Sequence, residues 1–182
     1  MLRDILAVFT TVAFLAVPCG AQTRAGQRPA AAAAAATQHP VANLSQLMKG
    51  ILYPASNVVF AAQSQNPADV KPAADPAMAT NPLASAYGQW QAVENSALAI
   101  VEAANLLTIP GRKCSNGLNV PFRNADWPKL VQGLRDAGMT VYKAAQAKNQ
   151  DGIVAAAGDL TEACDNCHGK YREKPDIAAR CK

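Results

Sequence analysis

Apolar residues recur every three or four positions in four stretches of this 182-residue chain. Such spacing places apolar side chains along one face of an α-helix. In the first stretch, residues 41–58, Pro54 interrupts the pattern and predicts a kink or a broken first helix. The apolar face of this stretch consists of Leu44, Leu47, Met48, Ile51, Leu52, Ala55 and Val58.

Three more helices are predicted further along the chain, at residues 83–109, 126–148 and about 153–173. Asp126 is the expected N-cap of the third helix, and a proline-rich connection at residues 65–82 separates the first helix from the second. Four helices in series, each with one apolar face, predict an all-α fold and a four-helix bundle.

The composition agrees with helices and limits the classes of function. Half of the residues are hydrophobic, but many of these are alanines and only 5% of the chain is aromatic. Alanine is the best helix former, whereas strands need β-branched and aromatic residues in alternation. The formal net charge is +4 without a dense run of Lys and Arg, so we expect no nucleic-acid binding.

The N-terminus has the pattern of a secretory signal peptide. Residues 5–18 are apolar throughout, which suits a signal-peptide core and is short for a membrane span. We expect a signal peptide at residues 1–21, an Ala/Pro-rich flexible tether at 22–40 and the helical domain at 41–182. The mature chain is then periplasmic, and it would contact a membrane only if Cys19 carried a lipid.

The segment CDNCH, near the end of the fourth helix, contains Cys164, Cys167 and His168. Cysteines three positions apart share one face of a helix, and Cys-x-x-Cys-His is the usual signal for covalent haem attachment. The same residues leave open a redox dithiol and cysteines that are merely buried or disulfide-bonded. A structural zinc module, completed by Cys114 and Cys181, is a further alternative. An exported, helix-rich chain favours haem over these alternatives.

The segment CDNCHGKYR, with the four expected helices, resembles the class II c-type cytochromes, the cytochrome c′ group. The resemblance implies an antiparallel four-helix bundle with one haem c covalently attached to Cys164 and Cys167. It implies His168 as the proximal iron ligand and Tyr171 packed at the haem edge. Arg172 either pairs with a haem propionate or faces solvent. We therefore expect a carrier of single electrons and not an enzyme.

The other axial position of the iron divides this group of cytochromes. Some members place a methionine from the first helix there, followed by a lysine, and transfer electrons. Met48 and Lys49 fit this pattern. Other members leave the position open beneath an apolar residue and bind nitric oxide or another small gas. We favour ligation by His168 and Met48, with a five-coordinate gas-binding protein and plain core packing of Met48 as the alternatives.

Cys114 and Cys181 remain once Cys19 and the two haem thiols are set aside. Leftover cysteines of an exported protein usually pair, so we expect a disulfide between the loop at residues 112–124 and the C-terminal tail. The expected partners are periplasmic redox proteins, and the resemblance also allows a homodimer.

Overall fold

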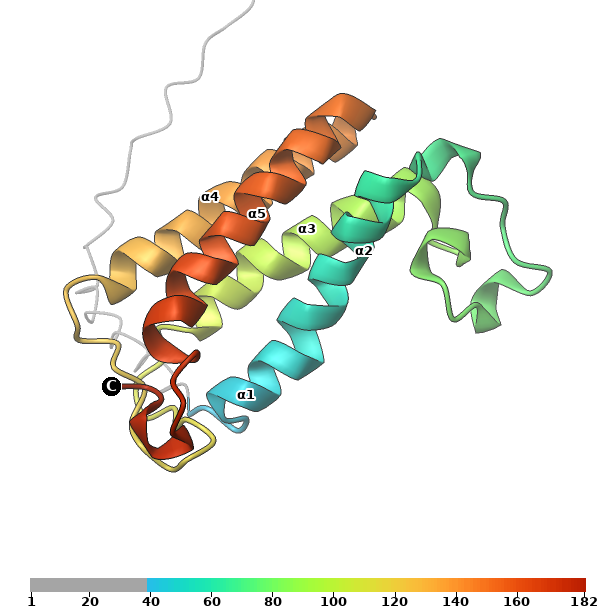
Figure 1. The fold of residues 1–182 in the computed structure, drawn as a ribbon. Coiled ribbons are helices and arrows are strands. Elements are labelled where there is room, and N and C mark those ends of the chain that lie inside the picture. Colours follow the sequence, from blue (N-terminus) through green and yellow to red (C-terminus); the bar gives the residue numbers. More distant parts are fainter. Residues whose placement is uncertain (1–38) are drawn as a thin grey trace, which may run out of the picture. The chain divides into compact units, whose positions relative to one another are not determined.

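Helices account for nearly all of the regular structure in residues 39–182, the part of the chain that the computed structural model describes (Figure 1). No β-strand occurs within these residues, so the predicted all-α fold is confirmed. None of the described helices is long and apolar enough to span a lipid bilayer. The expected signal peptide, Cys19 and all but the last two residues of the expected tether lie outside the described residues.

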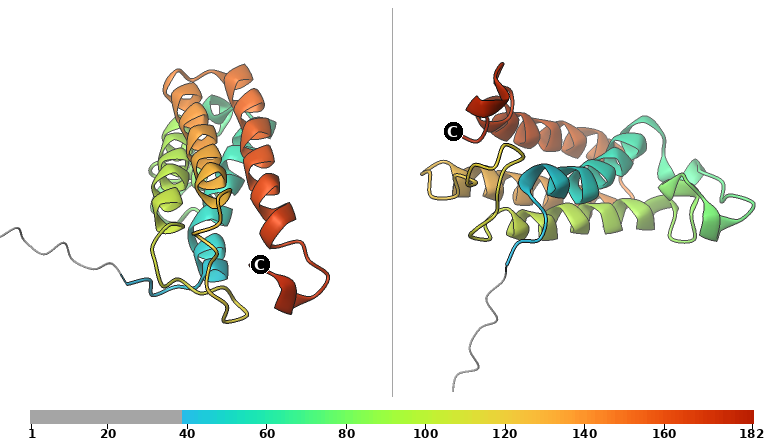
Figure 2. Two further views of the ribbon diagram at one scale, coloured as in Figure 1. Left: turned by 90° about the vertical axis from the view of Figure 1, so that its left-hand side faces the viewer. Right: turned by 90° about the horizontal axis from the view of Figure 1, so that it is seen from below.

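Four long helical segments pack around a common core, and each contacts two others. The first segment contacts the second and the fourth, and the third also contacts both the second and the fourth. Figure 2 shows this arrangement from two further sides. In chain order the segments are α1 (Leu44–Leu47) continued by a π-helical turn (Met48–Leu52) and α2 (Tyr53–Ser64), then α3 (Gln89–Leu106), α4 (Trp127–Gln146) and α5 (Gln150–Tyr171).

Pro54 does not break the first segment, which is helical without a gap from Leu44 to Ser64. The turn before it changes from α to π hydrogen bonding, because the N–H of Tyr53 donates to the carbonyl of Met48, five residues back. Pro54 has no N–H with which to continue the α pattern. The interruption expected from the sequence therefore takes the form of a change in hydrogen-bond register.

The proline-rich connection between α2 and α3 contains three short 3-10 turns. Each begins with an Asn-Pro or Asp-Pro pair, in which the Asn or Asp side chain accepts a hydrogen bond from a backbone N–H two residues on. The turns are Pro67–Asp69, Pro76–Met78 and Pro82–Ala84. The connection projects from one end of the four helices (Figure 1).

The predicted start of the second helix at Leu83 is wrong, because α3 begins at Gln89. The chain folds back on itself between these positions. A Cβ atom at Gly88 would lie 2.5 Å from the carbonyl oxygen of Leu83, so only glycine allows this close approach. The next residue, Gln89, has a φ of 53°, in the left-handed region. Because of this turn, Leu83 is buried but does not belong to the helix in which the apolar spacing had placed it.

The connection between α4 and α5 is tighter than the sequence indicated. Lys148 adopts a φ of 51° and ends α4, and the side chain of Asn149 accepts a hydrogen bond of 3.0 Å from the N–H of Gly152. Asn149 is therefore the N-cap of α5, and this helix begins at Gln150 and not at the expected position near residue 153.

The apolar faces predicted from the sequence form the core. Apolar spacing in the second predicted helix places seven residues on one face, namely Trp90, Val93, Ala97, Ile100, Val101, Ala104 and Leu107, and all but Val101 are buried. α3 and α4 approach closely at Gly138 of α4, where a Cβ atom would lie 2.9 Å from a methyl group of Val101 on α3.

Candidate functional site

The last two turns of α5 carry the Cys-x-x-Cys-His segment. On the apolar face of this helix, Ile153, Ala157 and Leu160 are at most 1% exposed. Cys164 and Cys167 continue the same face one and two turns later, but they are only half-buried and their thiols are free. The apolar face of α5 is therefore buried in the core up to Leu160 and only partly covered from Cys164 onward.

Met48 opens the π-helical turn of the first segment. Its side chain is partly buried and packs against the core, whereas the next residue, Lys49, is exposed. π-Helical turns are rare and occur often at functional sites, where the extra residue per turn shifts the direction of the side chains. The change in register caused by Pro54 therefore falls on the residue that the sequence suggested as an iron ligand.

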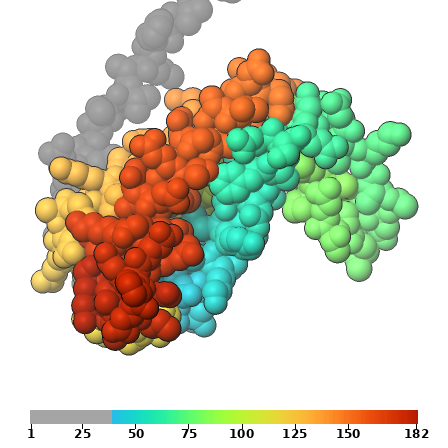
Figure 3. Space-filling view, viewed as in Figure 1, coloured from blue at the N-terminus to red at the C-terminus, as the bar shows by residue number. Residues whose placement is uncertain are grey.

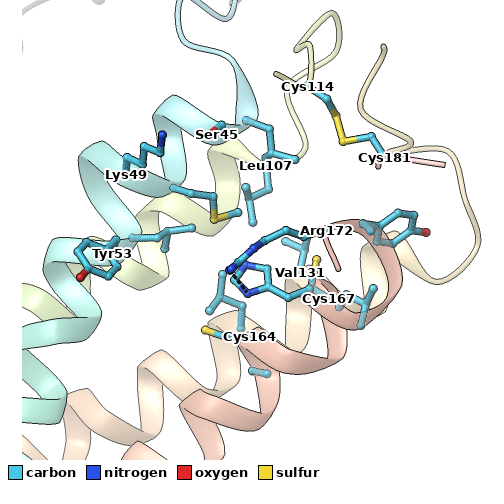
Figure 4. Close-up of a pocket in the computed structure, with 18 of the residues that line it drawn as sticks. Ser45, Lys49, Tyr53, Leu107, Cys114, Val131, Cys164, Cys167, Arg172 and Cys181 are labelled. Atoms are coloured by element: carbon cyan, nitrogen blue, oxygen red, sulfur yellow. Dashed lines mark hydrogen bonds between the residues drawn. A yellow bond between two sulfur atoms is a disulfide. The ribbon is translucent and has the colours of Figure 1, made fainter. Parts of the chain in front are cut away.

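A cavity of about 640 Å³ lies between the first segment and the end of α5 (Figure 4). Met48, Cys164, Cys167 and His168 all line it. Its volume is typical of cofactor and small-molecule sites, which occupy about 300–1,000 Å³. Aliphatic side chains are the largest group among the other lining residues, and they are Leu44, Leu52, Ile100, Leu107, Leu130, Val131, Leu134, Leu160 and Ala163.

The rim of the cavity includes a disulfide between Cys114 and Cys181, with the two Cα atoms 6.6 Å apart. The bond joins the loop between α3 and α4 to the C-terminal tail, the two segments expected to be linked. Asn116 adds to this connection, since its side-chain amide donates to the carbonyls of Ile177 (3.0 Å) and Arg180 (3.1 Å). Figure 3 shows the tail at the surface beside the last turns of α5.

Tyr171 lines the cavity from the end of α5 and is 3% exposed. Its ring packs edge-on against Trp127 with the ring centroids 5.1 Å apart. Its hydroxyl donates to a carboxylate oxygen of Asp126 (2.8 Å) and accepts from the side-chain amide of Asn124 (3.2 Å). These contacts fix the end of α5 against the start of α4.

Asp126 occupies the predicted N-cap position of α4, but its side chain does not cap the helix. Its backbone is already helical, with φ −88° and ψ −23°, and its side chain makes no capping hydrogen bond. The carboxylate turns instead toward α5, where it accepts from Tyr171 and pairs with Lys170 at 2.5 Å. The hydrogen bonds from Lys170 and Tyr171 lower the pKa of Asp126, so this carboxylate stays ionised at neutral pH.

Arg172 is an exposed residue whose guanidinium reaches the cavity and lies 3.1 Å from Nδ1 of His168 (Figure 4). A guanidinium can only donate, so Nδ1 is the acceptor and the neutral imidazole carries its proton on Nε2. Burial and the positive charge of Arg172 lower the pKa of His168. The imidazole is therefore neutral near pH 7, which is the form that binds metal ions.

The two free thiols do not have the properties of a reactive dithiol. Burial and the charge of Asp165 raise the pKa of Cys164. Burial, followed by the charges of Cys164 and Asp126, raises the pKa of Cys167 to about 11. Reactive and redox-active cysteines have lowered pKa values because the thiolate is the nucleophile. Both cysteines are therefore thiols at neutral pH, which disfavours the dithiol alternative.

The described residues also give little support to a zinc module. Nowhere in residues 39–182 do three His, Cys, Asp or Glu side chains gather closely enough to hold a metal ion by themselves. Cys114 and Cys181, the cysteines that might have completed such a site, are joined to each other. A structural zinc site needs four protein ligands.

Several residues of the site were not singled out from the sequence as part of it. Ser56, Arg180, Trp127, Tyr53 and Leu130 also line the cavity. The helical pattern places Trp127 and Leu130 on an inward face, but it does not show that this face borders a hollow. Arg180 lies in the tail, where no periodic pattern indicates its direction.

Comparisons with protein-family models, with curated proteins and with solved structures find no match to this chain. The function proposed below therefore depends on the residues and geometry of the chain itself.

Proposed function

We propose that this chain is a c-type cytochrome of the cytochrome c′ class that carries single electrons. One haem c would be attached to Cys164 and Cys167, with His168 and Met48 as axial ligands of the iron, in an antiparallel four-helix bundle. The observation that carries the proposal is a single cavity lined both by these three residues of α5 and by Met48 from the first helix. Met48 and His168, 120 positions apart in the sequence, supply the two expected ligands to one space.

The cavity fits a haem in its chemistry as well as its volume. Its aliphatic walls would pack against the flat macrocycle and keep water from the iron. The neutral thiols of Cys164 and Cys167 lie one helical turn apart on the cavity face, which is the spacing needed to bind two positions on one edge of the ring. Bound haem supplies one-electron chemistry, and a methionine opposite a histidine favours the reduced iron.

His168 and Arg172 have separate roles in this proposal. His168 would bind iron through one ring nitrogen, and its other nitrogen would then donate a hydrogen bond. Arg172 cannot accept a hydrogen bond, so it would leave Nδ1 if Nε2 bound the iron. Its guanidinium lines the cavity, so it would be available to pair with a haem propionate.

Export to the periplasm and redox partner proteins are part of the same proposal. The apolar N-terminal sequence supports export, and the Cys114–Cys181 disulfide suits an oxidising compartment. Transfer of single electrons requires a partner protein and no bond-making step, so we infer no enzymatic activity. A homodimer stays a prediction from the resemblance.

A five-coordinate cytochrome c′ that binds a small gas is the second candidate. Leu44 and Leu52 line the cavity from the same helical segment as Met48. If Met48 did not reach the iron, these side chains would leave an apolar space on that side, and such a space admits small neutral gases. The identity of the sixth ligand decides between the two functions.

Absorbance spectra of the haem-loaded protein, oxidised and reduced, test the proposal. We expect a low-spin ferrous spectrum in the wild type and a high-spin spectrum in Met48→Ala. Met78→Ala is the matched control, because Met78 is 77% exposed in the connection between α2 and α3 and should leave the spectrum unchanged. A low-spin spectrum that survives Met48→Ala would exclude Met48 as the ligand. A high-spin wild type would favour the gas-binding function.

A further inference from the structure

Arg112 is the one charged residue among the buried side chains of residues 39–182, with 4% of its surface exposed. It follows the end of α3, where Gly111 has a φ of 85°. This left-handed turn reverses the chain and directs Arg112 back toward the helix that has just ended. The residue does not line the cavity.

The guanidinium of Arg112 links two distant segments. Its Nε donates to the carbonyl of Leu106, the last residue of α3, at 3.0 Å. Its Nη1 donates to the carbonyl of Ala42, at 2.5 Å and 70 residues away in the sequence. The backbone beside it adds a third bond, from the N–H of Leu44 to the carbonyl of Lys113 at 2.8 Å. The end of α3 thereby holds the start of the first helix.

A buried cation is costly unless its environment compensates the charge. Within the described part of the chain no carboxylate forms a salt bridge with Arg112. Carbonyl oxygens compensate the charge instead, and the one from Leu106 belongs to a helix C-terminus, where the helix dipole favours a cation. The planar guanidinium can donate to both carbonyls at once, whereas a lysine ammonium has no such fixed fork. A lysine at this position would therefore not fully replace Arg112, although it carries the same charge.

We propose that Arg112 is a positioning residue that sets where Met48 lies over the cavity. Met48 follows Leu44 by one helical turn, and its N–H donates to the carbonyl of Leu44. Arg112 bonds to Ala42 and Lys113 bonds to Leu44, the residues before and after Asn43, the N-cap of α1. The effect of Arg112 on the iron rests on the proposed function, but its effect on the first helix does not.

The same loop offers a matched control, because its other side holds the C-terminal tail. Asn116 donates to the carbonyls of Ile177 and Arg180 and makes no bond to the first helix. Asn116→Ala should loosen the tail and leave Met48 in place. Arg112→Gln should loosen the first helix and leave the tail in place, because the Cys114–Cys181 disulfide still holds it.

Hydrogen exchange on the full-length protein tests the proposal independently of the haem. In Arg112→Gln we expect the amides of residues 44–52 to exchange about tenfold to a hundredfold faster, as loss of hydrogen bonds to a charged group implies. Amides of α4 should not change. Arg112→Lys should restore part of the protection, and it carries the test if Arg112→Gln does not fold. Uniform acceleration in all helices, or acceleration equal to that in Asn116→Ala, would overturn the positioning role.

Ligand competition on the haem-loaded protein tests the consequence for Met48. Added imidazole should replace Met48 at about tenfold lower concentration in Arg112→Gln than in the wild type, in proportion to the weakened anchor. Asn116→Ala should behave as the wild type. Faster exchange at residues 44–52 without a change in imidazole competition would overturn the link to Met48. A wild type without covalent haem would instead contradict the proposed function, and hydrogen exchange would still test the anchor.

Discussion

The half of the helical unit that contains residues 58–62 is filled by small side chains, whereas the half that contains Met48 encloses a cavity. In the filled half, Val59, Ala62, Val93 and Ile153 have no measurable exposure. The alanines there let the helices approach closely. In the hollow half the lining residues are larger, yet about 640 Å³ stays open between the first segment and the end of α5.

The two halves are also held together by different interactions. The filled half depends on apolar packing, to which the side chain of Gln150 adds a hydrogen bond of 2.9 Å to the carbonyl of Ala62. The hollow half is linked by the Cys114–Cys181 disulfide and the contacts of Tyr171 at the cavity, and by the hydrogen bonds of Arg112 outside it. A cavity without packing across it needs such covalent and polar links, because each open space forfeits dispersion and burial energy.

Removal of the disulfide should have the largest effect on stability, and it should act first on the hollow half. The bond closes a loop with a sequence separation of 67 residues, for which the chain-entropy model predicts about 4 kcal/mol. We expect this loss in urea unfolding of the Cys114→Ser, Cys181→Ser double variant. Hydrogen exchange should accelerate in the tail and spare α3 and α4 around Val93 and Val141. Equal acceleration in both halves would contradict the distinction between them.

Side-chain truncation should cost more in the filled half than beside the cavity. Ile153→Ala removes a side chain with 0% exposure and should cost about 2–5 kcal/mol in urea unfolding. Leu130→Ala removes a half-buried side chain that already borders the cavity, so it should cost clearly less in protein without haem. With haem bound, the two costs should become similar. Equal costs in the absence of haem would show that the cavity is closed in solution.

Two glycines of α4 should respond in opposite directions to the same substitution. Gly138→Ala puts a methyl group against Val101 of α3 and should destabilise the fold by about 1–3 kcal/mol. Gly133→Ala meets no atom within 4 Å and should stabilise it by up to about 1 kcal/mol through helix propensity. Thermal unfolding of both variants measures the difference. Stabilisation by Gly138→Ala would mean that α3 and α4 are less closely packed than described.

The polar contacts at the end of α5 should give the smallest effect, visible as a dependence of stability on pH. Lys170 and Tyr171 lower the pKa of Asp126, so the carboxylate stabilises the fold above the ordinary Asp pKa of about 3.9. This contribution is lost as the pH falls through the lowered pKa. Asp126→Asn should reduce the fall in urea midpoint below about pH 5. Asp136→Asn, on an exposed position of α4, is the control.

Sequence periodicity predicted the helices and which faces are buried, because apolar spacing of three and four depends only on helix geometry. It also placed Met48, Cys164 and Cys167 on inward faces, and the structure brings these faces to one cavity. It did not predict the start of α3, since the turn at Gly88 depends on contact with a carbonyl. The role of Asp126 was missed because its partners, Lys170 and Tyr171, are more than 40 residues away.

The cavity and Arg112 lie beyond what periodicity can show. A cavity depends on the sizes of side chains that meet from different helices, so the pattern of one helix does not predict it. Arg112 looks like an ordinary loop residue in the sequence, and its burial follows from a contact with Ala42, 70 residues away. The one local signal is its position directly after Pro110 and Gly111, where a basic residue can turn back to a helix C-terminus.

Covalent haem on Cys164 and Cys167 is the central claim, and intact-protein mass spectrometry tests it most directly. The chain should be produced in a host that attaches c-type haem, denatured in acid and measured without reduction. We predict the mass of the mature chain plus one haem, with the addition mapping to the peptide that contains both cysteines. The double variant Cys164→Ser, Cys167→Ser should lack it. A wild-type chain of unmodified mass with two alkylatable thiols at these positions would contradict the proposed function.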